Sequence, residues 1–184
     1  MIELIVTDDL YEKAKNLYEF KKRALNNSVT KGEGNVVGAV GEVMVESFYK
    51  GLYDNICIDS TYDYDLTMNG FKVDVKTKLL VFSPLSSYNC GIFNFNTTQK
   101  CDYYYFVFFS KEMMKCWLIG YIEPSDFYNK ASFNKKGELD ANSNNGFRFS
   151  DDCHNLQANL LTNIVSLDGN KEYCVNGSIV KRIK

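Results

Sequence analysis

The feature that most constrains the fold of this chain is the dipeptide Asn69-Gly70, which lies between two runs of alternating polar and apolar residues. Asn-Gly is the strongest short-range signal for a two-residue hairpin, because a type I′ turn requires positive φ at both central positions. The turn also fixes the register of the two strands. The predicted cross-strand pairs are Met68–Phe71, Leu66–Val73, Asp65–Asp74 and Asp63–Lys76.

The two-residue period of a strand assigns this hairpin a core face and a polar face. The core face is predicted to carry Leu66, Met68, Phe71, Val73 and Val75, and the polar face Asp63, Asp65, Asp74 and Lys76. Two carboxylates directly opposite each other, with Cβ atoms roughly 5 Å apart, repel and destabilise a sheet. A cation between Asp65 and Asp74 would remove that repulsion, and carboxylate oxygens suit Mg²⁺, for which Mn²⁺ is expected to substitute.

The role of Lys76 depends on which interpretation of the polar face holds. If Asp65 and Asp74 bind a metal ion, Lys76 can orient an attacking water or offset the charge of a phosphoryl-transfer transition state. The alternative is a solvent-exposed hairpin in which Asp63 and Lys76 form a surface ion pair.

The rest of the chain predicts a single α/β domain over residues 1–184. Helical spacing predicts helices over about 9–25 and 35–51, and a short helix beginning near Ser125. Short strands are predicted over 56–59, 63–68, 71–77, 90–95 and about 173–180. The continuous apolar runs 103–109 and 116–122 predict strands that are buried on both faces.

Composition excludes several classes of protein. Hydrophobic residues make up 45% and charged residues 24% of the chain, which is typical of a globular rather than a disordered protein. No apolar run is long enough to cross a membrane and the N-terminus lacks a signal-peptide pattern, so we expect a cytoplasmic protein with reduced cysteines and no membrane partner. Abundant lysine and asparagine are typical of an A/T-rich genome, such as that of a phage, whose product would act in the host cytoplasm.

Two further classes are disfavoured by the distribution of cysteine and histidine. The six cysteines are scattered without the close spacing of zinc ligands. The single histidine, His154, has no neighbouring nucleophile pattern, so a histidine general base is not expected.

The charge of the chain is small overall but uneven. The net charge of −2 argues against a nucleic-acid binder that relies on bulk charge. Between residues 13 and 31, however, six basic residues face a single acid, Glu19. The six are Lys13, Lys15, Lys21, Lys22, Arg23 and Lys31. This stretch is either a solvated helix face or a patch that contacts phosphate.

The spacing Asp65-x₈-Asp74-x-Lys76 resembles the core motif of the PD-(D/E)xK nuclease superfamily. Upstream, GNVVGAVGE (residues 34–42) resembles the Gly-x-x-Gly-Glu helix that precedes this motif in many members. Downstream, FNTTQKCDYYYFVFF resembles the segment in which Gln99 leads into a core strand. The resemblance covers about residues 32–122, with 123–184 as a C-terminal elaboration. The chain departs from the pattern in having Tyr64 in place of proline and Asp in place of the commoner Glu in the triplet.

This resemblance implies a restriction-endonuclease-like core, in which a mixed central β-sheet is flanked by helices, and Mg²⁺-dependent hydrolysis of DNA. It favours an endonuclease over an exonuclease. Asp65 and Asp74 would bind the metal together with the carbonyl of Val75, and Lys76 would assist the attacking water. Glu42 would be a further buried ligand. The alternatives for that position are an exposed Glu42, or Glu46 one turn later.

The partners implied are DNA and, because members that cut both strands are commonly dimers, a second copy of the chain. The predicted DNA contacts are Lys21, Lys22, Arg23, Lys31, Lys78 and Gln99. A second function class stays open, namely a catalytically inactive nucleic-acid- or protein-binding module of the same fold, such as a phage accessory protein. A carbohydrate-cleaving acid–base pair fits less well, because its carboxyl groups must straddle a sugar across roughly 5–9 Å and Lys76 would have no role.

Overall fold

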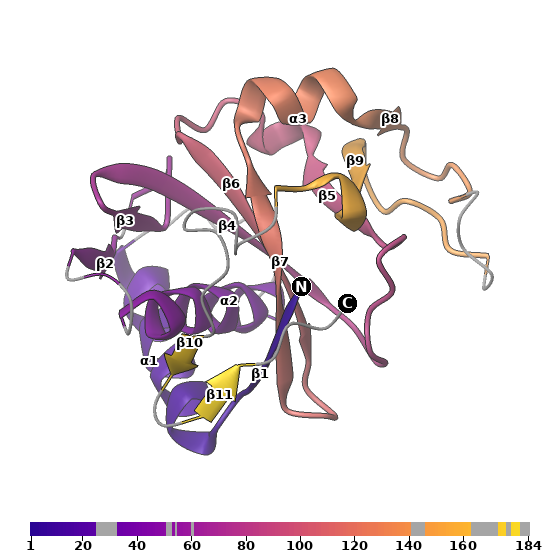
Figure 1. The fold of residues 1–184 in the computed structure, drawn as a ribbon. Helices are drawn as coiled ribbons and strands as arrows, with labels where there is room; N and C mark the ends of the chain where they lie inside the picture. The colour runs from indigo at the N-terminus through magenta and orange to yellow at the C-terminus, as the bar shows by residue number, and fades with distance from the viewer. Residues whose placement is uncertain are drawn as a thin grey trace.

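The computed structural model describes residues 1–24, 33–50, 53, 55–59, 61–140, 146–162, 173–175 and 178–180. Two helices cover one face of a six-stranded mixed sheet, and a smaller three-stranded sheet and a third helix lie on the other face (Figure 1). The predicted α/β class is therefore confirmed.

The six-stranded sheet contains the predicted hairpin, with β4 at the centre of the sheet and β3 next to its edge. Its strands, in spatial order, are β1 (Ile2–Ile5), β7 (Lys115–Ile122), β6 (Tyr103–Ser110), β4 (Phe71–Leu79), β3 (Leu66–Met68) and β2 (Ile56–Ile58). The strands β4 and β6 are parallel, and every other neighbouring pair in this sheet is antiparallel.

The helices and the remaining strands complete the fold. The helices are α1 (Asp8–Ala24), α2 (Glu33–Lys50) and α3 (Pro124–Lys130), with single 3₁₀ turns at Asn94–Asn96 and Ala158–Leu160. The second sheet has the order β5 (Asn89–Phe93), β9 (Cys153–Gln157) and β8 (Ser132–Asn134), and β10 (Tyr173–Val175) pairs with β11 (Ser178–Val180). All three predicted helices are confirmed to within about two residues at their described ends, whereas β1, β8 and β9 were not predicted.

The β3–β4 hairpin has the predicted turn and register. Asn69 and Gly70 have φ of 49° and 85°, and Leu66 pairs with Val73 as expected. Strand β3 is shorter than predicted, because Thr61 Oγ1 donates to the carbonyl of Tyr64 (2.7 Å) and folds residues 61–64 into a local turn. The prediction that Phe71 lies in the core is wrong: this side chain is 50% exposed at the end of the hairpin.

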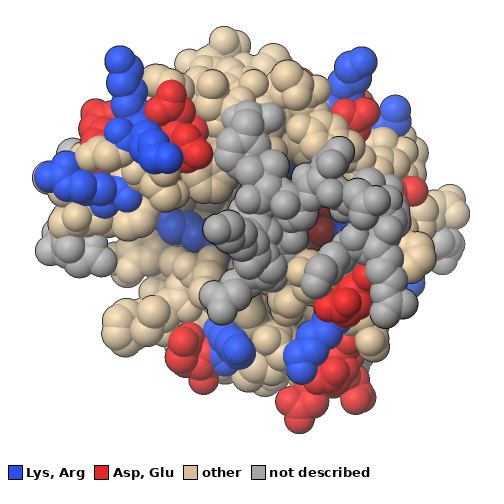
Figure 2. Space-filling view, turned by 180° about the vertical axis from the view of Figure 1, so that it is seen from behind, with Lys and Arg blue, Asp and Glu red and all other residues tan. Residues whose placement is uncertain are grey.

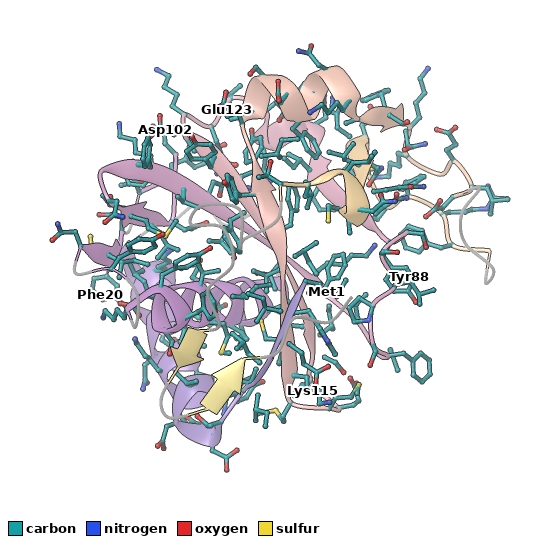
Figure 3. The ribbon with its side chains drawn as sticks, in the orientation of Figure 1. Met1, Phe20, Tyr88, Asp102, Lys115 and Glu123 are labelled. Atoms are coloured by element: carbon teal, nitrogen blue, oxygen red, sulfur yellow. The ribbon has the colours of Figure 1, made fainter. Side chains whose placement is uncertain are left out.

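Strand β6 is buried on both faces, as its apolar run predicted. Tyr105, Val107 and Phe109 belong to the core between the sheet and helices α1 and α2, and Tyr104, Phe106 and Phe108 to the core beneath the second sheet. The loop before β6 is tied to the hairpin, since Asp102 Oδ2 accepts a hydrogen bond from the Lys72 amide (2.8 Å; Asp102 is labelled in Figure 3).

Two further sequence-based expectations concern the cysteines and the membrane. All five cysteines whose side chains the structure describes are free; they are Cys57, Cys90, Cys101, Cys116 and Cys153. Cys174 lies in β10, outside the described side chains. None of the described helices is both long enough and apolar enough to cross a membrane.

Helix α2 packs closely on β4 at Gly41. A Cβ atom at this position would overlap Thr77 Oγ1, and the Cβ and Cγ2 atoms of Thr77 would lie at 3.1 and 3.3 Å. Every residue from 39 to 46 is buried, so this helix is covered on almost all sides. The absence of a side chain at Gly41 therefore sets the distance between α2 and β4, and with it the position of Glu42.

Gly41→Ala is expected to destabilise the fold by about 1–3 kcal/mol, the usual cost of overpacking a close interface. Gly38→Ala is the matched control, because no described atom lies within 4 Å of a Cβ there and alanine favours a helix by up to about 1 kcal/mol. Thermal unfolding followed by circular dichroism should show a lower melting temperature for the first variant and an equal or higher one for the second. Equal melting temperatures for both variants would contradict the close contact.

Candidate functional site

Three acidic side chains lie beside the β3–β4 hairpin, with Asp65 next to both Glu42 and Asp74. Glu42 comes from α2, Asp74 from β4, and Asp65 immediately precedes β3. The side chain of Asp65 is within hydrogen-bonding reach of both Asp74 and Glu42. Glu42 and Asp74 are buried, so the alternative of an exposed Glu42 is wrong. Asp65 and Asp74 therefore lie close together, as the hairpin predicted, although the regular strand pairing ends at Leu66–Val73.

At Val75, the edge of β4 that faces β3 is hydrogen-bonded to a side chain rather than to a neighbouring strand. Asp65 Oδ2 accepts a hydrogen bond from the amide of Val75 (2.9 Å). The N–H and C=O groups of one strand residue point to the same side of the strand. The carbonyl oxygen of Val75 therefore points to the same edge as the Asp65 carboxylate.

Lys76 is held at the site by two contacts. Its Nζ atom lies 2.6 Å from Asp74 Oδ2 and donates a hydrogen bond to Gln99 Oε1 (2.8 Å). Gln99 is fixed in turn, because its Nε2 donates to the carbonyl of Tyr62 (2.8 Å). Gln99, which was predicted to contact nucleic acid, thus orients Lys76.

The alternative interpretation of the hairpin required an ion pair between Asp63 and Lys76. Asp63 instead accepts a hydrogen bond from the amide of Lys100 (3.3 Å), and the ion-pair partner of Lys76 among the described residues is Asp74. A surface ion pair of Asp63 and Lys76 is therefore not formed.

Lys21 is a site residue that the sequence did not reveal as such. Its Nζ atom lies 2.7 Å from Glu42 Oε2 and 3.0 Å from Asp65 Oδ1, and only 14% of its side chain is exposed. It was predicted to contact DNA, but its ammonium group bridges two carboxylates instead. Nothing in its local spacing on α1 distinguishes it from its basic neighbours.

The close approach of the carboxylates changes their proton affinities. Burial, together with the charge of Asp65, raises the pKa of Glu42 to about 8 although Lys21 acts against this shift. Burial also raises the pKa of Asp74, to about 7, with Lys76 opposing and Asp65 adding to the shift. For Asp65, burial is outweighed by the Lys21 charge, the Asp74 contact and the Val75 amide, so its pKa is lowered. Without a further cation, protons are therefore retained here at neutral pH.

The donor set fits a small hard cation at Asp65 and Asp74. Asp74 Oδ2 is buried and accepts no hydrogen bond from any described residue, since the contact with Lys76 Nζ lacks hydrogen-bond geometry. Two carboxylates and the nearby Val75 carbonyl are all oxygen donors, as Mg²⁺ prefers. As arranged here, however, no three acidic, Cys or His side chains of the described residues converge as a ready metal-binding group. Glu42 is occupied by Lys21.

The other predicted basic contacts are mostly neutralised or lie outside the described side chains. Lys13 pairs with Glu46 (2.5 Å), which also pairs with Lys50, and Lys15 pairs with Glu12. On the face seen in Figure 2, the described Lys and Arg side chains form separate groups, most of them beside Asp or Glu. The side chains of Lys22 and Arg23, and the whole of Lys31, lie outside the described residues. Glu46 is buried but belongs to this peripheral group of charges, not to the site.

A pocket of about 380 Å³ adjoins the site along β4. It lies between β4 and β6 on one side and the second sheet on the other, and Lys76 and Lys78 both line it. Lys78 is accessible to solvent and donates a hydrogen bond to the carbonyl of Asn89 (3.1 Å), and burial lowers its pKa. No sequence signal predicted this pocket, because a third of its lining residues come from position 140 and from 147–155, far along the chain from β4.

No protein-family model matches this chain, and neither does any curated protein. Its function is therefore inferred from the geometry of these side chains.

Proposed function

We propose that the chain is a metal-dependent nuclease that hydrolyses DNA phosphodiester bonds. The observation that carries this proposal is the pair of Asp65 and the buried Asp74, with Lys76 held beside it by Gln99. The finer assignment to a restriction-endonuclease-like core is part of the proposal. It is supported by a hairpin that carries all three motif residues, whose second strand runs parallel to β6 under a helix that carries Glu42.

Each group has a role that follows from its position. Asp65, Asp74 and the carbonyl of Val75 would hold Mg²⁺, which when bound lowers the pKa of a water and neutralises phosphate charge. Lys76 presents an ammonium group to the negative charge that develops on the phosphate oxygens. Gln99 restricts that ammonium to one position, so little reorganisation is needed when the substrate arrives.

The position of Lys21 supports a second candidate function. An ammonium group that already neutralises Glu42 and Asp65 could replace a metal ion there, which would leave a binding module without catalysis. This candidate and the nuclease differ in one observable, the dependence of DNA cleavage on a divalent metal.

The test is cleavage of supercoiled plasmid and of linear single-stranded DNA with Mg²⁺ or Mn²⁺, with and without chelator. We expect cleavage by the native chain with metal, none with chelator, and none by Asp74→Asn. The control is Asp126→Asn, since Asp126 is exposed and pairs only with Lys130 among the described ion pairs. Intact DNA in every metal-containing reaction would refute the nuclease and leave the binding module. Equal cleavage by native protein and Asp74→Asn would remove the site from the proposal.

A further inference from the structure

The pocket beside Lys76 is built differently from the carboxylate site. Its inner wall is formed by Phe106 and Phe108, both buried, and Phe149 is also buried. Phe147 also lines it but is 49% exposed, and its ring meets that of Phe149 edge-on, with centroids 5.7 Å apart. The pocket thus has apolar, aromatic walls and an aromatic side chain that reaches solvent.

Polar groups are placed around these aromatic walls. The side chains of Asn96, Asn155 and Asp140 line the pocket, and they offer both hydrogen-bond donors and acceptors. Asn155 Nδ2 is itself oriented by Asn134 Oδ1 (2.9 Å). Flat aromatic surfaces with a few oriented amide and carboxylate groups match the faces and edges of a nucleobase.

Positive charge connects this pocket to the site. Lys76 and Lys78 are two positions apart on β4, so they lie on one face, about 6.6 Å apart along the strand. Lys76 contacts Asp74, whereas Lys78 Nζ lies 6.0 Å from the centroid of the Phe108 ring. A phosphate at Lys76 would therefore have the aromatic pocket within the reach of one nucleotide.

The volume of the pocket also suits a single nucleotide. About 380 Å³ falls in the usual range of small-molecule sites, roughly 300–1,000 Å³, and it is too small for a folded partner or a base-paired stack. A base that remains stacked inside a duplex cannot place its faces against the aromatic walls of such a pocket.

From these observations we propose that this pocket binds the base of an unpaired nucleotide next to the phosphate that is cleaved. The inference rests on the proposed nuclease function and narrows its substrate to single-stranded DNA or unpaired ends and flaps. Phe147 stacks on the base, Phe106 and Phe108 form the floor, and Lys78 lies beside the backbone.

The test compares two labelled probes with the same number of phosphates. One is a thymidine 12-mer, and the other is a 12-mer in which every nucleotide is an abasic tetrahydrofuran analogue. Affinities are measured by fluorescence anisotropy with the native chain in chelator, so that neither probe is cut. We expect the thymidine 12-mer to bind tenfold or more tightly than the abasic probe, because stacking one base on an aromatic side chain typically contributes that much.

Three substitutions test whether the preference for the thymidine 12-mer comes from the pocket. Phe147→Ala should remove most of the preference for the thymidine 12-mer. Phe133→Ala should leave it unchanged, because Phe133 is similarly exposed (46%) but does not line the pocket. Phe93→Ala, at another exposed lining residue, is a second pocket variant in case the first unfolds.

Equal affinities for the two probes would overturn the base pocket, and so would a preference that survives both pocket variants. If either result were found together with metal-dependent cleavage, the base pocket would be refuted and the nuclease proposal would remain. A preference that depends on Phe147, without metal-dependent cleavage of any DNA, would support the pocket as a nucleotide site and refute the nuclease.

Discussion

Lys76→Ala is expected to slow DNA cleavage by about 10²–10³-fold while DNA affinity stays nearly unchanged. The loss of one well-placed group that stabilises developing charge typically has this effect on the rate. The Lys76 ammonium is fixed between Asp74 and Gln99, and in the proposed mechanism it acts on the reacting phosphate rather than on the flanking backbone. Single-turnover cleavage at saturating protein measures the chemical step, and anisotropy in chelator measures binding.

The matched control for this variant is Lys130→Ala, since Lys130 is an exposed lysine in a one-turn ion pair with Asp126. That variant should cleave at the native rate. A Lys76→Ala protein that cleaves within a few-fold of the native rate would contradict the catalytic assignment. A variant that loses affinity and rate equally would indicate that Lys76 only binds phosphate.

The second large effect concerns stability as a function of pH and metal. In chelator, the melting temperature of the native chain should fall as pH rises from about 4 to about 8, and adding Mg²⁺ at pH 8 should raise it. At a hundredfold excess over Kd, a ligand that binds only the folded state stabilises it by about 2.7 kcal/mol, or roughly 5–10 °C for a chain of this size. Calorimetry or dye-monitored unfolding with graded Mg²⁺ and Mn²⁺ provides the measurement.

The sign of the pH effect follows from the direction of the pKa shifts. The pKa of Asp74 and that of Glu42 are raised in the folded state, to about 7 and about 8. Unfolded carboxyl groups lose their protons near pH 4, so between pH 4 and 8 the folded chain binds more protons, and its stability falls as pH rises. The lowered pKa of Asp65 acts oppositely, but only below the ordinary carboxyl range.

Asp74→Asn should weaken this pH dependence, leaving the part that Glu42 contributes, and should remove most of the response to Mg²⁺, because an amide carries no charge to neutralise. Asp126→Asn should behave like the native chain. If graded Mg²⁺ and Mn²⁺ leave the native melting temperature unmoved at pH 8, the pair of Asp65 and Asp74 is not a metal site.

The sequence predicted the parts of this molecule that depend on local geometry. The turn at Asn69-Gly70 determines which side chains face each other, so the opposition of Asp65 and Asp74 followed from counting residues. The burial of Tyr103–Phe109 followed from a run that has no polar side to expose. The prediction that Phe71 lies in the core was wrong because the hairpin extends past the helices that cover the rest of its face. The length of a neighbouring helix cannot be read from the residues of the hairpin.

The parts that were missed depend on contacts between distant segments. Lys21 reaches Glu42 and Asp65 only because α1 packs on α2, and no spacing within α1 encodes that contact. Strand β9 contains the polar sequence CHNLQ, which has no clear alternation, yet it forms the centre of the second sheet and one wall of the pocket. Sequence periodicity cannot show that these residues lie across from Lys78.

The ammonium group of Lys21 has a consequence for whether the chain needs a metal ion in order to fold. Two ammonium groups face the three carboxyl groups of the site, and because the pKa of Glu42 is raised to about 8, a retained proton compensates the third at neutral pH before any metal arrives. Many metal sites form only when the ion is present, because their ligands repel one another without it. Here the chain supplies most of the compensating charge itself. On the proposed function, the chain is therefore expected to fold in chelator and to bind the metal ion afterwards.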